Sequence, residues 1–394
     1  MLSTLLLASA LLQTPSQIAT PLEAPFRATE DAIIVNAIIN GKTISFMFDT
    51  GFGGHFVIND QINIGPYTGT MNLQDFVGVF QAHTVAVKGF QIGQLKQPNV
   101  KAEAVMQPIS HMTASYGTHT DGIMGLEAVM DYVTEINFER QKFIFHPKST
   151  DITKRKPDNK RTFLAKMEPR GMNSIELVTK INGKPVHLAL DTGNAFYATT
   201  HKEVLERVGV WDPNKKPQFL KQSWVASGPV DSFAILIPES TIFGVPVKDS
   251  VWDIIDLPAA SAQGDGTVGY GFLKNFNIII DYERRHVWLE NFTGKVKDEV
   301  QGEPGIRVAQ REGGGHVVFT VYKGSPAEEK GVKAGDSLLA IDGKNLSTVL
   351  PQKIKSLLEG AVDTTCKLVI SRGGIIQHLE VPRKLMVNRT TSAG

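Results

Sequence analysis

The chain has 394 residues, which at roughly 150 residues per domain predicts two or three domains and excludes a single small module. Hydrophobic residues make up 42% and charged residues 21%, a balance typical of globular proteins that argues against wholesale disorder. The 41 Lys and Arg residues are offset by 40 Asp and Glu residues, so no net field steers the chain onto nucleic acid, and we expect no nucleic-acid partner.

An apolar stretch, residues 2–12, opens the chain and is too short to span a bilayer, but it suits the apolar region of a secretory signal. Ala8 and Ala10 form an early cleavage pattern, and cleavage nearer Ala19 stays open. We expect residues 1–20 to be a signal peptide and the protein to be exported, periplasmic or extracellular; a frayed N-terminus is the alternative. No later apolar run reaches the roughly 18 residues of a membrane helix.

An internal repeat organises the following part of the chain. Residues 40–51 and 182–193 each begin with an Asn-Gly turn, continue with alternating apolar residues and end in Asp-Thr-Gly. Each copy therefore predicts a hairpin whose second strand delivers an aspartate at its end, Asp49 in the first copy and Asp191 in the second.

Two further pairs of sequence segments match and follow in the same order in both copies. They are residues 121–125 with 265–269, and residues 137–145 with 281–289. Three matched pairs of segments indicate two copies of one β-rich unit, at residues 27–148 and 172–292. Between the units, residues 149–171 include a run of Lys and Arg that we expect to be a solvated linker, with an anion-binding patch as the alternative.

A short helix is expected within each unit. In the second copy, Thr200 and Glu203 have the spacing of a capping box, and Gly209 is a suitable C-terminal stop. These signals predict a helix of about two turns.

The chain changes character after Asn291. Ser325, Pro326 and Gly331 provide the cap, first-turn proline and terminal glycine of a short helix. Further strands, a turn at 342–343, a helix at about 351–359 and a Gly-Gly hairpin at 373–374 predict a small β-rich barrel with two helices. We place this domain at residues 303–384, with a flexible tail at residues 385–394.

This third segment resembles a PDZ domain of the bacterial protease type. The residues that carry the resemblance are 324–327, 331–336 and 341–343. The resemblance implies a loop whose backbone N–H groups receive the terminal carboxylate of a peptide that adds as a strand. Its residues are Gly305, Ile306, Arg307 and Val308. Arg307 replaces a glycine common in the family, and a PDZ fold that only braces the rest of the chain is the alternative.

Two aspartates at equivalent positions of a repeat permit acid–base chemistry. If the units pack about a pseudo-two-fold axis, Asp49 meets Asp191, and the pair shares one proton because adjacent like charges resist joint ionisation. One carboxylate then activates a water for attack on an amide carbonyl while the other donates a proton. Hydroxyl groups that can pin the two loops, and glycines that permit close approach, follow the aspartates. They are Thr50, Thr192, Gly51 and Gly193.

The residues around both aspartates resemble the active-site motifs of pepsin- and retropepsin-like aspartic proteases. Residues 46–51 and 188–193 carry the resemblance, and residues 123–125 and 267–269 resemble the segments that complete each lobe's crossed loop. With the PDZ segment, the resemblance extends to bacterial aspartyl proteases that carry a PDZ domain. It implies an all-β fold, a bilobal pair of double-ψ β-barrels followed by a PDZ domain.

The resemblance also implies catalysis by Asp49 and Asp191, with a flap over the cleft from residues 64–83, where Tyr67 and Phe76 are candidate contacts. Phe52 and Asn194 stand directly after the motif glycines, where pepsin-like sites usually have Ser or Thr. One hydroxyl that would favour an ionised carboxylate is therefore missing, and we expect a less acidic working pH than that of the most acidic members of the family.

Other chemistries find less support. The sole cysteine, Cys366, can form no disulfide within the chain, and the strand-like residues that follow it indicate a buried side chain. The histidines lack zinc-protease spacing, and neither a serine-hydrolase elbow nor a phosphate-binding glycine loop occurs. We expect no metal and no cofactor.

The sequence thus predicts an exported, monomeric aspartic endopeptidase that acts on peptides or unfolded proteins, with a PDZ domain for peptide or C-terminus binding. The alternative is a non-catalytic peptide-binding or scaffold protein that uses the same cleft and the PDZ groove. A protease active only as a homodimer is disfavoured because both motifs lie in one chain. The residues before Pro25 are too few for a folded propeptide, so none is expected.

Overall fold

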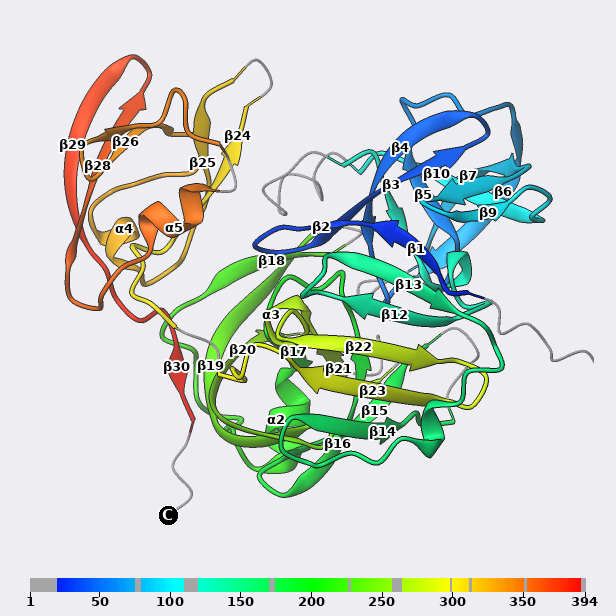
Figure 1. Ribbon diagram of the computed structural model, residues 1–394. Coiled ribbons are helices and arrows are strands. Elements are labelled where there is room, and N and C mark those ends of the chain that lie inside the picture. Colours follow the sequence, from blue (N-terminus) through cyan, green and yellow to red (C-terminus); the bar gives the residue numbers. More distant parts are fainter. Residues whose placement is uncertain are drawn as a thin grey trace, which may run out of the picture.

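A computed structural model describes most of residues 20–390. The gaps are residues 75–78, 110–119, 170–173, 226–227, 257–263, 298–299, 312–313 and 351–352. The expected signal peptide, apart from its last residue, and Phe76 lie outside the described residues. The structure is mostly β (Figure 1), and none of its described helices is long and apolar enough to cross a membrane.

The first repeat unit forms a ten-stranded sheet in the order β6-β7-β10-β5-β11-β4-β3-β8-β9, with β2 paired to β3. Its strands are β2 (Arg27–Ala28), β3 (Ile33–Ile39), β4 (Lys42–Phe48), β5 (Phe56–Asn59), β6 (Tyr67–Gln74), β7 (Val79–Val87), β8 (Phe90–Ile92), β9 (Leu95–Gln97), β10 (Ala102–Gln107) and β11 (Gly122–Met124). The predicted hairpin is β3–β4, joined by a turn in which Asn40 and Gly41 both have positive φ.

The second unit forms an eight-stranded sheet in the order β15-β16-β21-β17-β20-β19-β18, with β30 paired to β19. Its strands are β15 (Glu176–Ile181), β16 (Lys184–Leu190), β17 (Ala198–His201), β18 (Lys221–Val225), β19 (Gly228–Ile242), β20 (Val245–Ile255), β21 (Gly266–Val268) and β30 (Asn388–Arg389). The hairpin β15–β16 turns at Asn182 and Gly183, which have the same positive-φ geometry as the first copy.

The two units repeat one strand topology. In the first, β11 lies between β4, to which it is parallel, and β5, to which it is antiparallel. In the second, β21 lies between β16 and β17 with the same directions. The matched aspartates Asp121 and Asp265 accept backbone N–H groups from Ser45 at 3.0 Å and His187 at 2.9 Å, which ties each inserted strand to its hairpin.

A six-stranded sheet joins the two units, in the order β1-β13-β12-β22-β23-β14. Its strands are β1 (Leu22–Pro25), β12 (Val133–Asn137), β13 (Lys142–His146), β14 (Thr162–Lys166), β22 (Phe276–Asp281) and β23 (His286–Asn291). Strands β12 and β22 pair at its centre, with β12 and β13 from the first unit, β22 and β23 from the second, and β1 and β14 at the two edges. One hydrophobic core runs through both units.

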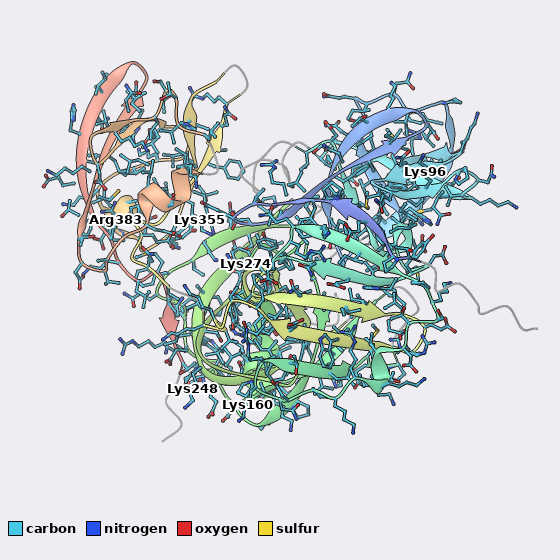
Figure 2. The ribbon with its side chains drawn as sticks, in the orientation of Figure 1. Lys96, Lys160, Lys248, Lys274, Lys355 and Arg383 are labelled. Atoms are coloured by element: carbon cyan, nitrogen blue, oxygen red, sulfur yellow. The ribbon has the colours of Figure 1, made fainter. Side chains whose placement is uncertain are left out.

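The segment expected as a solvated linker is folded instead. It includes the 3-10 helix η2 (Ile152–Lys154) and β14, which pairs with β23 at the edge of the joining sheet. Ile152 and Phe163 are buried, because the polar run is interrupted by apolar residues that pack on this sheet. The basic side chains Lys154 and Lys160 remain exposed, and Figure 2 marks Lys160 on the second unit.

Helix α2 (Lys202–Val208) matches the predicted helix of the second unit, and it ends at Gly209, whose φ is 79°. The predicted capping box is absent, because the Thr200 hydroxyl donates to the Asp265 carbonyl oxygen at 2.6 Å and His201 occupies the cap position. Among its described residues, the first unit has the 3-10 helix η1 (Leu126–Ala128), and α3 (Tyr270–Leu273) stands at the matching place in the second.

The C-terminal domain has its own hydrophobic core and a sheet in the order β24-β25-β26-β28-β29, with β27 paired to β26. Its elements are β24 (Ile306–Gln310), β25 (His316–Val321), α4 (Pro326–Glu329), β26 (Ser337–Ile341), β27 (Lys344–Asn345), α5 (Ile354–Leu358), β28 (Thr365–Arg372) and β29 (Ile375–Pro382). Ser325 caps α4 by accepting the Glu328 N–H, as predicted, and Cys366 is buried.

The expectation of a flexible tail at residues 385–394 is also wrong for the first of these residues. Strand β30 follows the third domain and pairs in parallel with β19 of the second unit. The buried Asn388 carboxamide accepts the N–H of Gln218 at 2.6 Å and donates to the Ala234 carbonyl oxygen at 3.0 Å. Leu220 and Lys323 exchange backbone hydrogen bonds nearby, so two contacts fix the third domain to the second unit.

We expect Asn388→Ala to destabilise the protein by about 2 kcal/mol, because it removes the side-chain partner of the buried Ala234 carbonyl and that of the Gln218 N–H. Urea unfolding followed by tryptophan fluorescence measures the loss. The exposed neighbour Arg389→Ala provides the control and should leave the unfolding midpoint unchanged. Equal midpoints for both variants would contradict a structural role of β30.

Candidate active site

The ends of two matched strands carry the predicted aspartates. Asp49 follows β4 and Asp191 follows β16. The inserted strands hold them in place, because the Asp49 N–H donates to the Met124 carbonyl oxygen at 2.9 Å and the Asp191 N–H to that of Val268 at 3.0 Å. The topology thus points both side chains from the two units toward one place.

The structure brings the two carboxyl groups together. A Cβ added to Gly51 would lie 2.7 Å from Cγ of Asp191, and one added to Gly193 would lie 2.4 Å from Cγ of Asp49. No side chain larger than that of glycine fits at either position. The carboxyl groups of Asp49 and Asp191 also hydrogen-bond each other.

Thr50 and Thr192 lock the two loops through four reciprocal hydrogen bonds. The Thr50 hydroxyl donates to the Leu190 carbonyl oxygen at 2.7 Å, and the Thr192 hydroxyl donates to that of Phe48 at 2.8 Å. Each hydroxyl also accepts the backbone N–H of the other threonine, at 2.9 and 3.1 Å. Both side chains are buried, so these bonds fix the distance between the strand ends.

Backbone donors favour the ionised form of each carboxylate. Oδ1 of Asp49 accepts the N–H groups of Gly51 at 2.7 Å and Phe52 at 3.2 Å. Oδ1 of Asp191 accepts those of Gly193 at 2.9 Å and Asn194 at 3.1 Å. In these backbone hydrogen bonds, the Asp49 half and the Asp191 half of the site are equivalent.

Burial and mutual repulsion act against these donors and raise both pKa values. The pKa of Asp49 lies well above its ordinary value because of burial first, and then because of the neighbouring Asp191 charge. Burial also raises the pKa of Asp191, but hydrogen bonds from Asp49, the backbone and Thr267 oppose the rise. The two carboxyl groups therefore titrate as one coupled pair that shares a proton, and the hydrogen bond from Thr267 favours the ionised form of Asp191.

A threonine that the sequence reading missed makes the site asymmetric. The Asn194 side-chain amide donates to Oγ1 of Thr267 at 2.7 Å and to Oγ1 of Thr199 at 2.9 Å. The oxygen of the Thr267 hydroxyl accepts from Asn194, so its proton is available for the hydrogen bond to Asp191. We expected a hydroxyl to be missing beside the carboxylates. At Asp191 the structure corrects this expectation, because β21 supplies a hydroxyl there.

The first unit has no such group, since Phe52 and Ile123 occupy the matching positions. A signal for this difference was available in the sequence. The segment 265–269 has a threonine where the matched segment 121–125 has isoleucine.

The β6–β7 hairpin lies where a flap was expected. Tyr67 pairs with Val85 at the end of the hairpin away from the turn, and its ring stacks on His83 with centroids 4.5 Å apart. Tyr67 is therefore not at the tip. The turn itself, with Phe76, lies outside the described residues.

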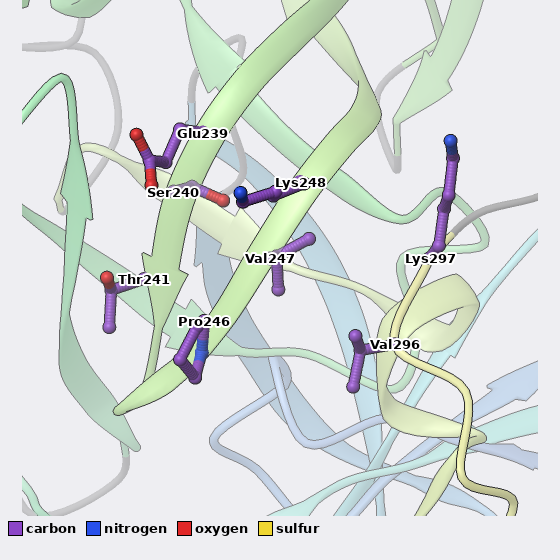
Figure 3. Close-up of a pocket in the computed structure, with 8 residues that line it drawn as sticks. All are labelled: Glu239, Ser240, Thr241, Pro246, Val247, Lys248, Val296 and Lys297. Carbon is purple, nitrogen blue, oxygen red and sulfur yellow. The ribbon is translucent and has the colours of Figure 1, made fainter.

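No group of three or more His, Cys, Asp or Glu side chains in the described part of the chain could hold a metal ion. A hollow of about 320 Å³ lies on the β19–β20 ribbon, between Glu239, Lys248 and Lys297 (Figure 3). None of its lining residues belongs to the aspartate site.

The third domain presents an open strand edge beside a helix. Gly305 precedes this strand, β24, with a φ of 86°, and an added Cβ there would lie 2.3 Å from Cβ of Ser325. Ile306 is buried in the domain core and Val308 packs partly against it. Among the described strands, β24 pairs with β25 alone, and α5 lies against it on the other side.

The Arg307 side chain, expected to help hold a peptide carboxylate, already has partners within the chain. It hydrogen-bonds the buried Tyr322 hydroxyl, and the negative charges of Glu303 and Asp31 lie near it. These neighbours raise its pKa further above its already high ordinary value.

An edge strand beside a helix defines a peptide-binding module that extends its own sheet with a bound strand. Residues 317–372 match the family model described as PDZ domain, so this part of the chain is a PDZ domain. No curated protein matches the chain. Among solved structures, the photosystem II D1 C-terminal processing protease is 25% identical over 23% of this chain and 25% of that one, with a TM-score of 0.22.

We expect Thr192→Val to destabilise the contact between the two units by about 2 kcal/mol, because the buried Thr50 N–H and Phe48 carbonyl lose their partner. Urea unfolding measures the change, and Thr192→Ser, which keeps the hydroxyl, should recover most of it. A Val variant as stable as the parent would show that the four bonds do not hold the units together.

Proposed function

We propose that the chain is an aspartic endopeptidase whose catalytic residues are Asp49 and Asp191, and whose PDZ domain binds peptide segments. The observation that carries the proposal is the contact between the carboxyl groups at the ends of matched strands, with a glycine backbone against each one. Few structural needs would place two acidic groups in contact, whereas acid–base hydrolysis needs such a pair.

We assign the two roles from the hydroxyl of Thr267, which favours the ionised form of Asp191. The ionised Asp191 takes a proton from a water molecule, whose oxygen forms a bond to the amide carbon. Asp49 gives its proton to the carbonyl oxygen, which yields a neutral gem-diol. Asp191 then protonates the leaving nitrogen, Asp49 recovers a proton from the gem-diol, and the C–N bond breaks, so that one water is consumed for each bond cleaved.

Several features support a pepsin- or retropepsin-like pair of double-ψ barrels as the scaffold. Both units have the inserted strand, parallel to the aspartate-bearing strand, that crosses the loop. A sheet built from both units supports an active monomer, because one chain holds both aspartates. The apolar stretch at residues 2–12 supports export to the periplasm or beyond.

A peptide-binding protein without catalysis is the second candidate, and the PDZ domain favours it. The two candidates differ in one respect. Only the enzyme requires ionisable groups at both strand ends.

We expect Asp49→Asn and Asp191→Asn each to abolish cleavage, because one variant lacks the acid and the other lacks the base. Incubation with unfolded protein from pH 3 to 8, with new termini identified by mass spectrometry, measures cleavage. Asp60→Asn changes an exposed acid of the first unit and should cut like the parent. If parent protein binds the mixture without cutting it, the peptide-binding candidate is the better one.

We expect Thr267→Val to shift the acidic limb of kcat/KM upward by about one pH unit, the size of a hydrogen bond to a charged group. The hydroxyl stabilises ionised Asp191, so its loss raises the pKa of that carboxyl, and the base is protonated at a higher pH. Thr267→Ser should restore the limb. Thr200→Val removes another buried hydroxyl of this lobe, one that bonds the Asp265 carbonyl, and should not move the limb. An unmoved limb in Thr267→Val would contradict the role of Thr267.

A further inference from the structure

An acidic turn of the first unit reaches the PDZ domain. The turn joins β2 to β3 and extends toward α5 (Figure 1). Oδ1 of Asp31 lies 3.1 Å from Nζ of Lys355 in α5, and Oε1 of Glu30 lies 3.8 Å from Nζ of Lys353, the residue before this helix. Figure 2 shows Lys355 on the side of the PDZ domain that faces the other two units.

The face that receives this turn is basic. Arg307 of β24 lies within electrostatic reach of both Asp31 and Lys355, so the strand and the helix contribute cations to one place. Burial opposes the charge of Lys355, but the attraction of Asp31 outweighs it and leaves the pKa of this lysine raised. We call Lys353, Lys355 and Arg307 the basic rim.

The basic rim borders the edge of β24 on which no strand of the described part of the chain is paired. A peptide that adds to this edge would run between β24 and α5 and would bring its side chains past the rim. The rim already holds two carboxylates of the chain itself, and this shows what kind of side chain it accepts. The negative charges of nearby Glu359 and Glu303 offset part of the positive charge of the rim. A ligand that replaces Asp31 must therefore carry negative charge of its own.

We infer that the groove between β24 and α5 selects peptides with acidic side chains next to the strand they add, and that the Glu30–Asp31 turn is an internal occupant which such a peptide displaces. The groove then binds an acidic peptide better than its amide counterpart, and the turn weakens binding of both by competing for the rim. This inference rests on the PDZ domain and does not need the aspartate chemistry.

The turn is held from a second side as well. The Tyr270 hydroxyl donates to the Thr29 carbonyl oxygen at 2.7 Å, and the Lys274 ammonium group donates to that of Glu30 at 3.5 Å. Displacement therefore has to separate the acidic side chains from the rim while the backbone of the turn stays attached to α3. For this reason we expect competition to depend on the two side chains and to leave the fold of the first unit intact.

The test uses the full chain carrying Asp49→Asn, so that no peptide is cut during the measurement. Fluorescence anisotropy compares a labelled peptide whose four C-terminal residues include two Asp or Glu with the same peptide carrying Asn or Gln. We expect the acidic peptide to bind about three- to tenfold more tightly, the range of two partly exposed ion pairs, and the difference to shrink at high salt.

Two variants separate the two parts of the inference. Glu30→Gln with Asp31→Asn should tighten binding of the acidic peptide about threefold or more, because the competitor loses its charge. Lys355→Met should remove the preference for the acidic peptide. Lys367→Gln removes a lysine of β28 whose partner is Glu380 of β29, and this variant should behave like the parent.

Equal binding of both peptides to the parent overturns the selectivity. Unchanged affinity in the turn variant overturns the internal occupant. Thermal unfolding of each variant shows whether a loss of binding comes from a loss of the fold. Because cleavage is never measured, an inactive aspartate pair leaves all of these outcomes interpretable.

Discussion

Two carboxyl groups can stay in contact only if they share a proton and if the surrounding structure resists their repulsion. The four bonds of Thr50 and Thr192 provide this resistance at the contact itself. Behind them, the joining sheet pairs β12 with β22, and a single hydrophobic core runs through both units. A movement between the units would therefore break buried hydrogen bonds and open a packed core.

The symmetry of the fold ends beside the two aspartates. Both halves supply the same backbone donors, yet only Asp191 receives a hydroxyl, from Thr267. Asn194 orients that hydroxyl, while Phe52 fills the matching place with a hydrocarbon ring. The two halves of a repeated scaffold thus differ beside the carboxyl groups at two matched positions, where one unit has Asn194 and Thr267 and the other has Phe52 and Ile123.

Local patterns allowed the sequence to predict the hairpins, the turn glycines, the cap of α4 and the aspartate-bearing strand ends. Contacts between distant segments were harder to foresee. Strand β14 lies within a basic run whose few apolar residues pack on a sheet made elsewhere in the chain. The contact of Asp31 with Lys355 joins residues far apart in sequence, and no periodic pattern encodes it. The role of Thr267 depends on an amide from another loop, which only the folded chain brings near.

Strand β30 makes the order of synthesis matter. It follows the PDZ domain in the chain, yet it pairs with β19 in the sheet that carries Asp191. During translation the second unit therefore waits for its last strand until the whole PDZ domain has been made. A nascent chain interrupted within the PDZ domain would leave a short stretch of β19 around Ile235 and Leu236, between its pairings with β18 and β15, open to other strands.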